Sequence, residues 1–134
     1  MKLTTSEAEK LREDAITCLR AGDARRAWEL LEQICAPESG ADPQWLLLAH
    51  ACRTLGDDSG EERALQMLLV IDKRHLPALL LMGELKARTN DDRAANSFYR
   101  AALNMVGVGA AVSSDLRPKL KQAEEFLAGA HGRF

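Results

Sequence analysis

The segment NDDRAANSFYRAAL, residues 90–103, carries paired alanines on both sides of two bulky aromatic residues, Phe98 and Tyr99. Small residues on one face of a helix allow a neighbouring backbone to approach closely, and a large side chain then fills a socket in that neighbour. The segment therefore predicts one member of a closely packed helix pair. On this interpretation Phe98 and Tyr99 are packing residues and not part of a cofactor site.

The Asn90-Asp91 pair that opens this segment is the last of three chain breakers at a constant spacing. Gly56-Asp57 lies 34 residues before it, and Gly22-Asp23 lies another 34 residues earlier. The same shift, applied without a gap, aligns residues of similar size in three columns: Leu11, Trp45 and Leu79; Ala15, Ala49 and Gly83; Leu31, Leu65 and Tyr99. A fixed period of this length indicates stacked copies of one supersecondary unit.

The residue composition predicts helices within each period. Leucine, alanine, arginine and glutamate are frequent and β-branched residues are sparse, which favours helix throughout. The breaker pairs then divide each period into two helices, expected at 6–21 and 24–36, 43–55 and 59–71, and 77–89 and 91–105. Ser6 with Glu9, and Ser59 with Glu62, match the capping box that marks a helix start.

A seventh helix is expected after the third period, at about 114–128. Its apolar residues form one stripe at helical spacing: Leu116, Leu120, Ala123 and Leu127. A single helix with one apolar stripe is what closes the end of a repeat stack, because the last repeat otherwise exposes its apolar face.

The second and third periods also carry the residue pattern of a known family. The matching residues are Trp45-x-x-Leu48-Ala49-x-x-Cys52, then Met82-Gly83, then Ala95-x-x-x-Tyr99. With them the chain resembles the tetratricopeptide repeat (TPR) family. The resemblance implies an all-α fold, a right-handed α-solenoid of three TPR helix pairs plus a C-terminal capping helix. It also implies a single domain over 1–134, with repeats at about 8–41, 42–75 and 76–109 and the capping helix at about 114–128.

The sequence departs from the family pattern at four positions. Ser39, Lys73 and Gly107 stand where a proline usually closes each repeat. Glu61 stands where the family has a small residue. These departures leave the helix ends and the packing around Glu61 open.

In TPR stacks the first helix of each repeat lines a concave groove that binds a peptide. Carried over column by column, the resemblance selects Arg12, Ile16, Leu46, His50, Arg53, Leu80, Glu84 and Arg88. This set combines apolar contact area with guanidinium groups that can hold a carboxylate. The same arginines also fit an ordinary solvated face. The lysine and asparagine arrangement that clamps a peptide C-terminus in some members is absent, which disfavours that ligand.

No pattern in the sequence indicates catalysis. His50, His75 and His131 stand in separate contexts without the spacing of a metal site, and G-x-S-x-G is absent. The stretch VGVGAA, residues 106–111, holds a lone G-x-G after a helix, whereas a phosphate-binding loop follows a strand. We therefore predict no catalytic residue, no metal and no cofactor.

Charge and cysteine content limit the classes of binding partner and the cellular compartment that we expect for this chain. The net charge of −2 gives no reason to expect nucleic acid or a membrane surface as the main partner. Cys18, Cys35 and Cys52 are an odd number without C-x-x-C spacing, which favours buried, reduced thiols. The first residues, MKLTTSEAEK, contain no apolar signal segment, so a cytoplasmic protein is expected.

A second resemblance covers residues 70–103 and 113–127, VIDKRHLPALLLMGELKARTNDDRAANSFYRAAL and SSDLRPKLKQAEEFL. These segments are similar to the helical repeat region that precedes the catalytic domain in bacterial aspartyl/asparaginyl β-hydroxylase-like proteins. The resemblance implies an accessory domain beside a 2-oxoglutarate/Fe(II) oxygenase domain, whose metal ligands are not among these residues.

Three hypotheses of function follow from the sequence. The first is a non-catalytic module that binds a protein, a peptide segment or an adjacent domain of the same polypeptide. The second is the hydroxylase accessory domain. The third is a scaffold that pairs with a second copy of itself as a homodimer.

Overall fold

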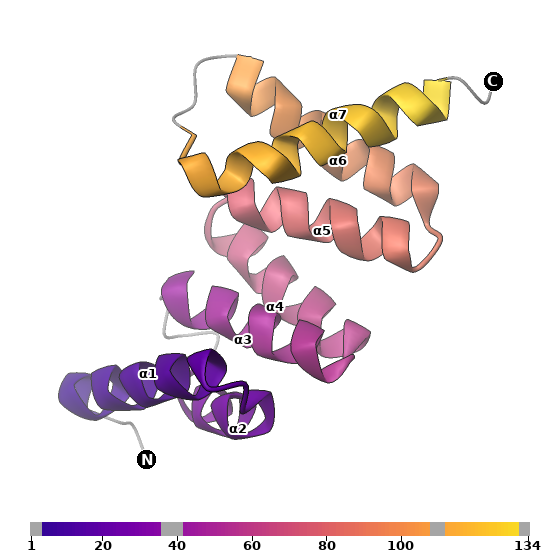
Figure 1. Ribbon diagram of the computed structural model, residues 1–134. Helices are drawn as coiled ribbons and strands as arrows, with labels where there is room; N and C mark the ends of the chain where they lie inside the picture. The colour runs from indigo at the N-terminus through magenta and orange to yellow at the C-terminus, as the bar shows by residue number, and fades with distance from the viewer. Residues whose placement is uncertain (1–3, 36–41, 108–111, 132–134) are drawn as a thin grey trace. The chain divides into compact units, whose positions relative to one another are not determined.

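A computed structural model describes residues 4–35, 42–107 and 112–131, and over these ranges it is helical without any strand. The elements are α1 (Thr5–Arg20), α2 (Ala24–Ile34), α3 (Asp42–Leu55), α4 (Asp58–Ile71), α5 (Leu76–Arg88), α6 (Asp92–Gly107), a 3₁₀ turn η1 (Ser114–Leu116) and α7 (Arg117–His131) (Figure 1). The predicted all-α fold and its seven α-helices are confirmed, with ends that differ by a few residues. Ser39 and residues 108–111 of the VGVGAA stretch lie outside the described ranges.

The three breaker pairs form the same turn. Their first residues adopt the left-handed conformation, with φ of 86° at Gly22, 77° at Gly56 and 66° at Asn90. Glycine and asparagine tolerate this conformation best. The following N–H group then reaches back five residues to a helix carbonyl: Asp23 to Cys18 at 2.8 Å, Asp57 to Cys52 at 2.9 Å, and Asp91 to Lys86 at 2.8 Å. This is the Schellman bond that satisfies the end of a helix.

The aspartate of each pair also starts the next helix. Its Oδ1 accepts a hydrogen bond from a backbone N–H three residues on: Arg26 at 3.1 Å, Gly60 at 3.0 Å and Ala94 at 3.2 Å. One dipeptide thus closes one helix and caps the next.

Both predicted capping boxes are wrong in position. At α1 the box is formed by Thr4 and Glu7, whose reciprocal bonds measure 3.1 and 3.3 Å, and not by Ser6. At α4 the side chain of Asp57 takes the place expected for Ser59. In both cases the helix starts earlier than expected, because a capping residue lies upstream of the serine.

The chain divides into two compact units, residues 1–71 and 72–134, so the predicted single domain stays a prediction. In the first unit α1 packs against α2, α2 against α3, and α3 against α4. The core of this unit includes residues of the aligned columns, Ala15, Leu31, Ala49 and Leu65, together with Ala27, Leu48, Cys52 and Leu68, each at most 2% exposed. Glu61 is 1% exposed in the same unit, so the column expected to hold a small residue instead buries a carboxylate.

The second unit is built around Tyr99 of α6, which is 1% exposed. A Cβ added to Gly83 of α5 would lie 2.5 Å from the Tyr99 ring, so the two helices approach as closely as a glycine permits. Tyr99 also contacts Phe126 of α7, with ring centroids 5.2 Å apart and ring planes tilted by 59°. The predicted closely packed helix pair is confirmed, and the structure shows that Gly83 provides the socket for Tyr99.

Candidate functional site

The first unit brings five of the eight candidate residues onto two neighbouring helices. Arg12 and Ile16 lie one turn apart on α1, and Leu46, His50 and Arg53 follow one face of α3. Arg12, Ile16 and Leu46 are half-buried, while His50 and Arg53 are exposed. Because α1 also packs against α3, apolar area and basic groups lie on adjoining helices of one unit.

The second unit holds the other three candidates on α5, and it presents them differently. Leu80 is fully buried and Glu84 is 8% exposed, whereas Arg88 is exposed. The reason is that α5 is apolar around most of its circumference, and every residue from Ala78 to Leu85 is buried. Leu80 therefore serves the core, and we do not retain it as a contact residue.

Glu84 is held by the capping helix. The Lys119 Nζ of α7 donates to the Glu84 Oε1 at 2.9 Å, with side chains 30% and 7% exposed. Burial of a carboxylate is costly unless a charged partner satisfies it. Sequence analysis missed this pair because its members lie 35 residues apart, outside every repeat column. Its signal in the sequence was one acidic residue within the apolar run of residues 76–85.

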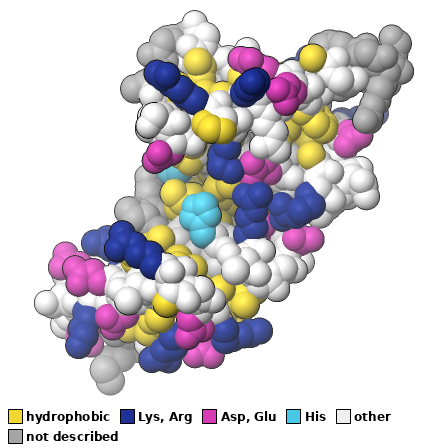
Figure 2. Space-filling view, in the orientation of Figure 1, with side chains coloured by type: hydrophobic (Ala, Val, Ile, Leu, Met, Phe, Trp, Pro, Cys, Tyr) yellow, Lys and Arg dark blue, Asp and Glu magenta, His cyan; other side chains and the backbone are white. Residues whose placement is uncertain are grey.

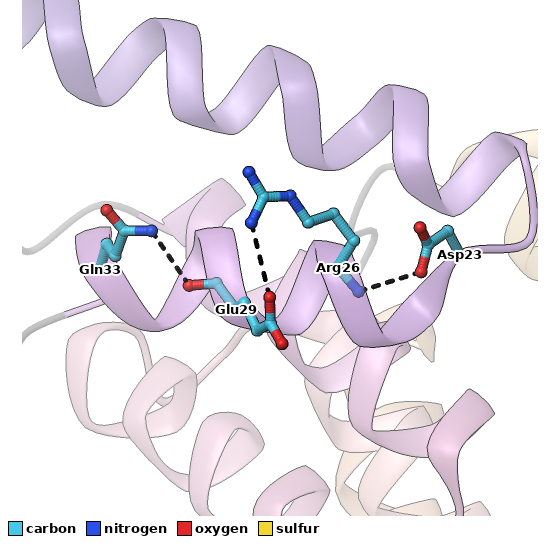
Figure 3. Close-up of polar contacts among 4 residues, drawn as sticks. All are labelled: Asp23, Arg26, Glu29 and Gln33. Atoms are coloured by element: carbon cyan, nitrogen blue, oxygen red, sulfur yellow. Dashed lines mark hydrogen bonds and ion pairs between the residues drawn. The ribbon is translucent and has the colours of Figure 1, made fainter.

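The outer face of α2 is polar, and it serves as a comparison for the candidate residues on α1 and α3. Figure 3 shows Asp23 capping the Arg26 N–H, the Arg26 Nη1 at 3.5 Å from the Glu29 Oε2, and Gln33 donating to the Glu29 carbonyl at 3.4 Å. Arg26 and Glu29 side chains are 57% and 48% exposed. These polar groups satisfy one another along a single helix, which is the ordinary state of a solvated face.

The cysteines do not form a reactive centre. Cys52 is buried, but Cys18 and Cys35 are only half-buried, so the expected burial holds for one of the three. Burial, with Glu32 nearby, raises the pKa of Cys35 to about 12. Burial, with Asp57 nearby, raises the pKa of Cys52 to about 11. Both groups are thiols at neutral pH, and a thiol is a poor nucleophile and metal ligand.

Two further observations concern metals and membranes. Among residues 4–35, 42–107 and 112–131, no three His, Cys, Asp or Glu side chains gather in a way that could hold a metal ion. No helix within the described part of the chain combines the length and apolar character needed to cross a bilayer.

The face shown in Figure 2 intersperses hydrophobic side chains with basic and acidic ones, and neither sign of charge dominates it.

Comparison with known proteins identifies the fold. No protein-family model and no curated protein sequence matches the chain. It is similar to the Yersinia enterocolitica chaperone SycD in complex with a peptide of the translocator YopD, with a TM-score of 0.85 and 13% identity over 99% of this chain and 98% of that one. It is also similar to Pseudomonas aeruginosa PcrH in complex with the chaperone-binding region of PopD, with a TM-score of 0.81 and 15% identity over 98% and 96%.

A third similar structure is the Sgt2 TPR domain of Aspergillus fumigatus, with a TM-score of 0.75 and 17% identity over 95% of this chain and 83% of that one. Together with the all-helical element order, these likenesses show an α-solenoid of TPR type.

Proposed function

We propose that this chain is a non-catalytic module that binds a protein or peptide segment in the cytoplasm. Support comes from the fold, since two similar structures contain a bound protein segment: a peptide of the translocator YopD on SycD and the chaperone-binding region of PopD on PcrH. The absence of any recognisable catalytic motif in the sequence agrees with a binding role.

The binding surface in this proposal is the exposed part of the first helices. The observation that carries it is the composition of α1 and α3, where half-buried Ile16 and Leu46 adjoin Arg12, His50 and Arg53. Burial of the apolar side chains contributes binding free energy, and the guanidinium groups orient a carboxylate of the ligand through hydrogen bonds. The ligand that fits is a segment with an apolar side chain and an acidic group, from another protein or from an adjacent domain of the same polypeptide. In the second unit, Arg88 carries the same kind of group at the exposed end of α5.

The two alternative functions differ in their support. The structures described above give no support to the resemblance to β-hydroxylase-like proteins. Self-association is favoured by one observation: Val70 and Ile71 at the end of α4 are 73% and 37% exposed, although both are large and apolar. Light scattering of the parent chain and of Val70→Lys tests this alternative, because an interface through α4 would make the variant dissociate at a higher concentration.

The binding function is tested by replacing Arg53 and Arg88 together with glutamate. A partner is recovered from the source cell's lysate by the parent chain, identified, and then titrated against parent and variant. We expect affinity to fall about tenfold or more, because the variant loses charge-assisted contacts and gains like-charge repulsion. Arg26→Glu on the outer face of α2 is the matched control. Equal binding by parent and double variant, or an equal loss in the control, would move the site away from the first helices.

A further inference from the structure

A charged side chain that lies at least partly in the protein interior needs a partner, because burial removes the water that would otherwise satisfy it. Among the side chains that the structure describes, the half-buried and buried charged residues are Arg12, Glu32, Glu61, Glu62, Glu84, Lys86 and Lys119. Glu32 pairs with Arg63 at 3.0 Å, and Glu84 pairs with Lys119 at 2.9 Å. Glu61, Glu62 and Lys86 also interact with other groups.

Arg12 of α1 is the exception in this set. Over residues 4–35, 42–107 and 112–131, no hydrogen bond, ion pair or ring contact joins its guanidinium to another group. A guanidinium carries five N–H donors and keeps its charge at any physiological pH. Arg12 can therefore offer its donors to a ligand, whereas Arg53 and Arg88, the other arginines among the candidates, already interact with groups of the protein.

We infer that Arg12 is the residue of the proposed binding surface that holds the acidic group of the ligand, and that Arg53 and Arg88 contribute less. The inference rests on the proposed function, because it concerns the same ligand. Half-buried Ile16 lies one turn after Arg12 on the same side of α1, about 6 Å along the helix. An extended peptide segment fits this spacing when glutamate and leucine stand two positions apart, because such residues share one side and lie about 6–7 Å from each other.

The acidic residues of α1 do not cancel the charge that Arg12 offers. Glu13 and Asp14 lie about 100° and 200° around the helix from Arg12. Both are exposed, as is Glu9, so solvent and salt screen their charges. Glu9 lies one turn before Arg12 and shares its side of α1, so its carboxylate should lower the affinity for an acidic group slightly.

The test uses the full chain and two synthetic probes. One is a short fluorescent peptide that repeats Glu-Ser-Leu-Ser, and the other carries glutamine in place of every glutamate. We expect the parent to bind the acidic peptide more tightly. Arg12→Gln should weaken binding of the acidic peptide about tenfold and leave the glutamine peptide unchanged, because it removes a charge-assisted contact that only the acidic peptide makes. Lys10→Gln is the matched control, since Lys10 is an exposed cation about 160° around the same helix.

Further measurements locate the contact. Arg53→Gln combined with Arg88→Gln should weaken the acidic peptide less than Arg12→Gln does, and Glu9→Gln should strengthen it about twofold. In the NMR spectrum of isotope-labelled parent, the acidic peptide should shift the Nε–H resonance of Arg12 more than that of Arg20, an exposed arginine at the end of α1. Circular dichroism confirms that each variant is folded, and the NMR measurement decides the case if Arg12→Gln is not.

The remaining outcomes contradict different statements. If the parent binds neither peptide, or both equally, the ligand chemistry of the proposed function is wrong and the inference fails with it. If the parent prefers the acidic peptide but the double variant at Arg53 and Arg88 loses more affinity than Arg12→Gln, the proposed function stands and the inference is wrong. Equal weakening of both peptides by Arg12→Gln, an equal loss in Lys10→Gln, or an unshifted Arg12 resonance at saturating acidic peptide would also overturn the inference.

Discussion

Helices α3 and α5 are related by the 34-residue period, yet they present their faces differently. Leu46 on α3 is half-buried and His50 is exposed, while their equivalents on α5, Leu80 and Glu84, are buried. Residues on nearly every side of α5 are buried in the core, because the helix packs against both α6 and α7. The comparison teaches that equivalent repeat positions need not be equally exposed: Leu46 and His50 of α3 are accessible at least in part, whereas Leu80 and Glu84 of α5 are buried.

The largest expected effect separates the two aligned leucines. Leu80→Ala should lower the free energy of unfolding by about 2–5 kcal/mol, as expected for a cavity in a filled core. Leu46→Ala should cost only about 1 kcal/mol, because its side chain is already partly in contact with water. Urea unfolding followed by circular dichroism measures both. Equal losses would show that the two helices are buried alike and would remove the contrast.

A second comparison concerns the next column, where α3 has Ala49 and α5 has Gly83. Gly83→Leu should destabilise the chain by about 1–3 kcal/mol, because even a Cβ at this position would meet the Tyr99 ring. Ala49→Gly should cost about 1 kcal/mol through helix propensity alone. The same unfolding experiment applies. A Gly83→Leu variant as stable as the parent would contradict the close approach of α5 and α6.

We expect the capping aspartates of the two units to contribute equally to stability. They therefore provide a control for the contrast between α3 and α5. Asp57→Ala and Asp91→Ala each remove one side-chain bond to a backbone N–H and should each cost about 1 kcal/mol. Thermal or urea unfolding is sufficient to measure them. A large cost at only one position would mean that its aspartate has a role beyond capping.

The last comparison concerns only the first unit, which contains all three cysteines. The pKa values of Cys35 and Cys52 rise from 9.0 to about 12 and about 11. Above pH 9 the unfolded chain therefore loses thiol protons that the folded chain keeps. Stability that is fully present below pH 9 should fall as the pH rises toward 11 and 12.

A comparison of variants isolates this dependence from the rest of the chain's response to pH. Cys35→Ala combined with Cys52→Ala should show a shallower loss of unfolding free energy between pH 9 and pH 11 than the parent. Cys18→Ala is the matched control. Identical pH profiles for parent and double variant would show that these thiols do not couple to folding.

The sequence was informative where the controlling signals are local. Breaker pairs such as Asn90-Asp91 set the helix ends through bonds within a few residues, and Gly83 with Tyr99 marked a close crossing by size alone. The all-helical repeat fold could be predicted for these reasons. The capping errors are also local, because Thr4-x-x-Glu7 matches the same pattern as Ser6-x-x-Glu9 and the two overlap.

The exposure of the candidate site residues could not be predicted in the same way. A repeat column states which face of a helix a residue occupies, but not whether a neighbouring element covers that face. Leu80 was expected to be accessible and is buried. Glu84 was expected to face a ligand and is paired with Lys119, a residue of the helix that follows the last repeat and has no column. Contacts of this kind depend on tertiary packing, which a periodic pattern does not encode.

The repeated turn has a consequence for how such a chain can change length. Every bond of the Gly-Asp or Asn-Asp turn joins residues of the same period, from Cys18 to Arg26 in the first and from Lys86 to Ala94 in the third. Duplication of one whole 34-residue period would therefore bring its connector along intact. The dipeptide therefore forms the same turn in every copy of the repeat. A chain that grows by tandem duplication needs new packing only between helix faces, because each copied period already contains its turn.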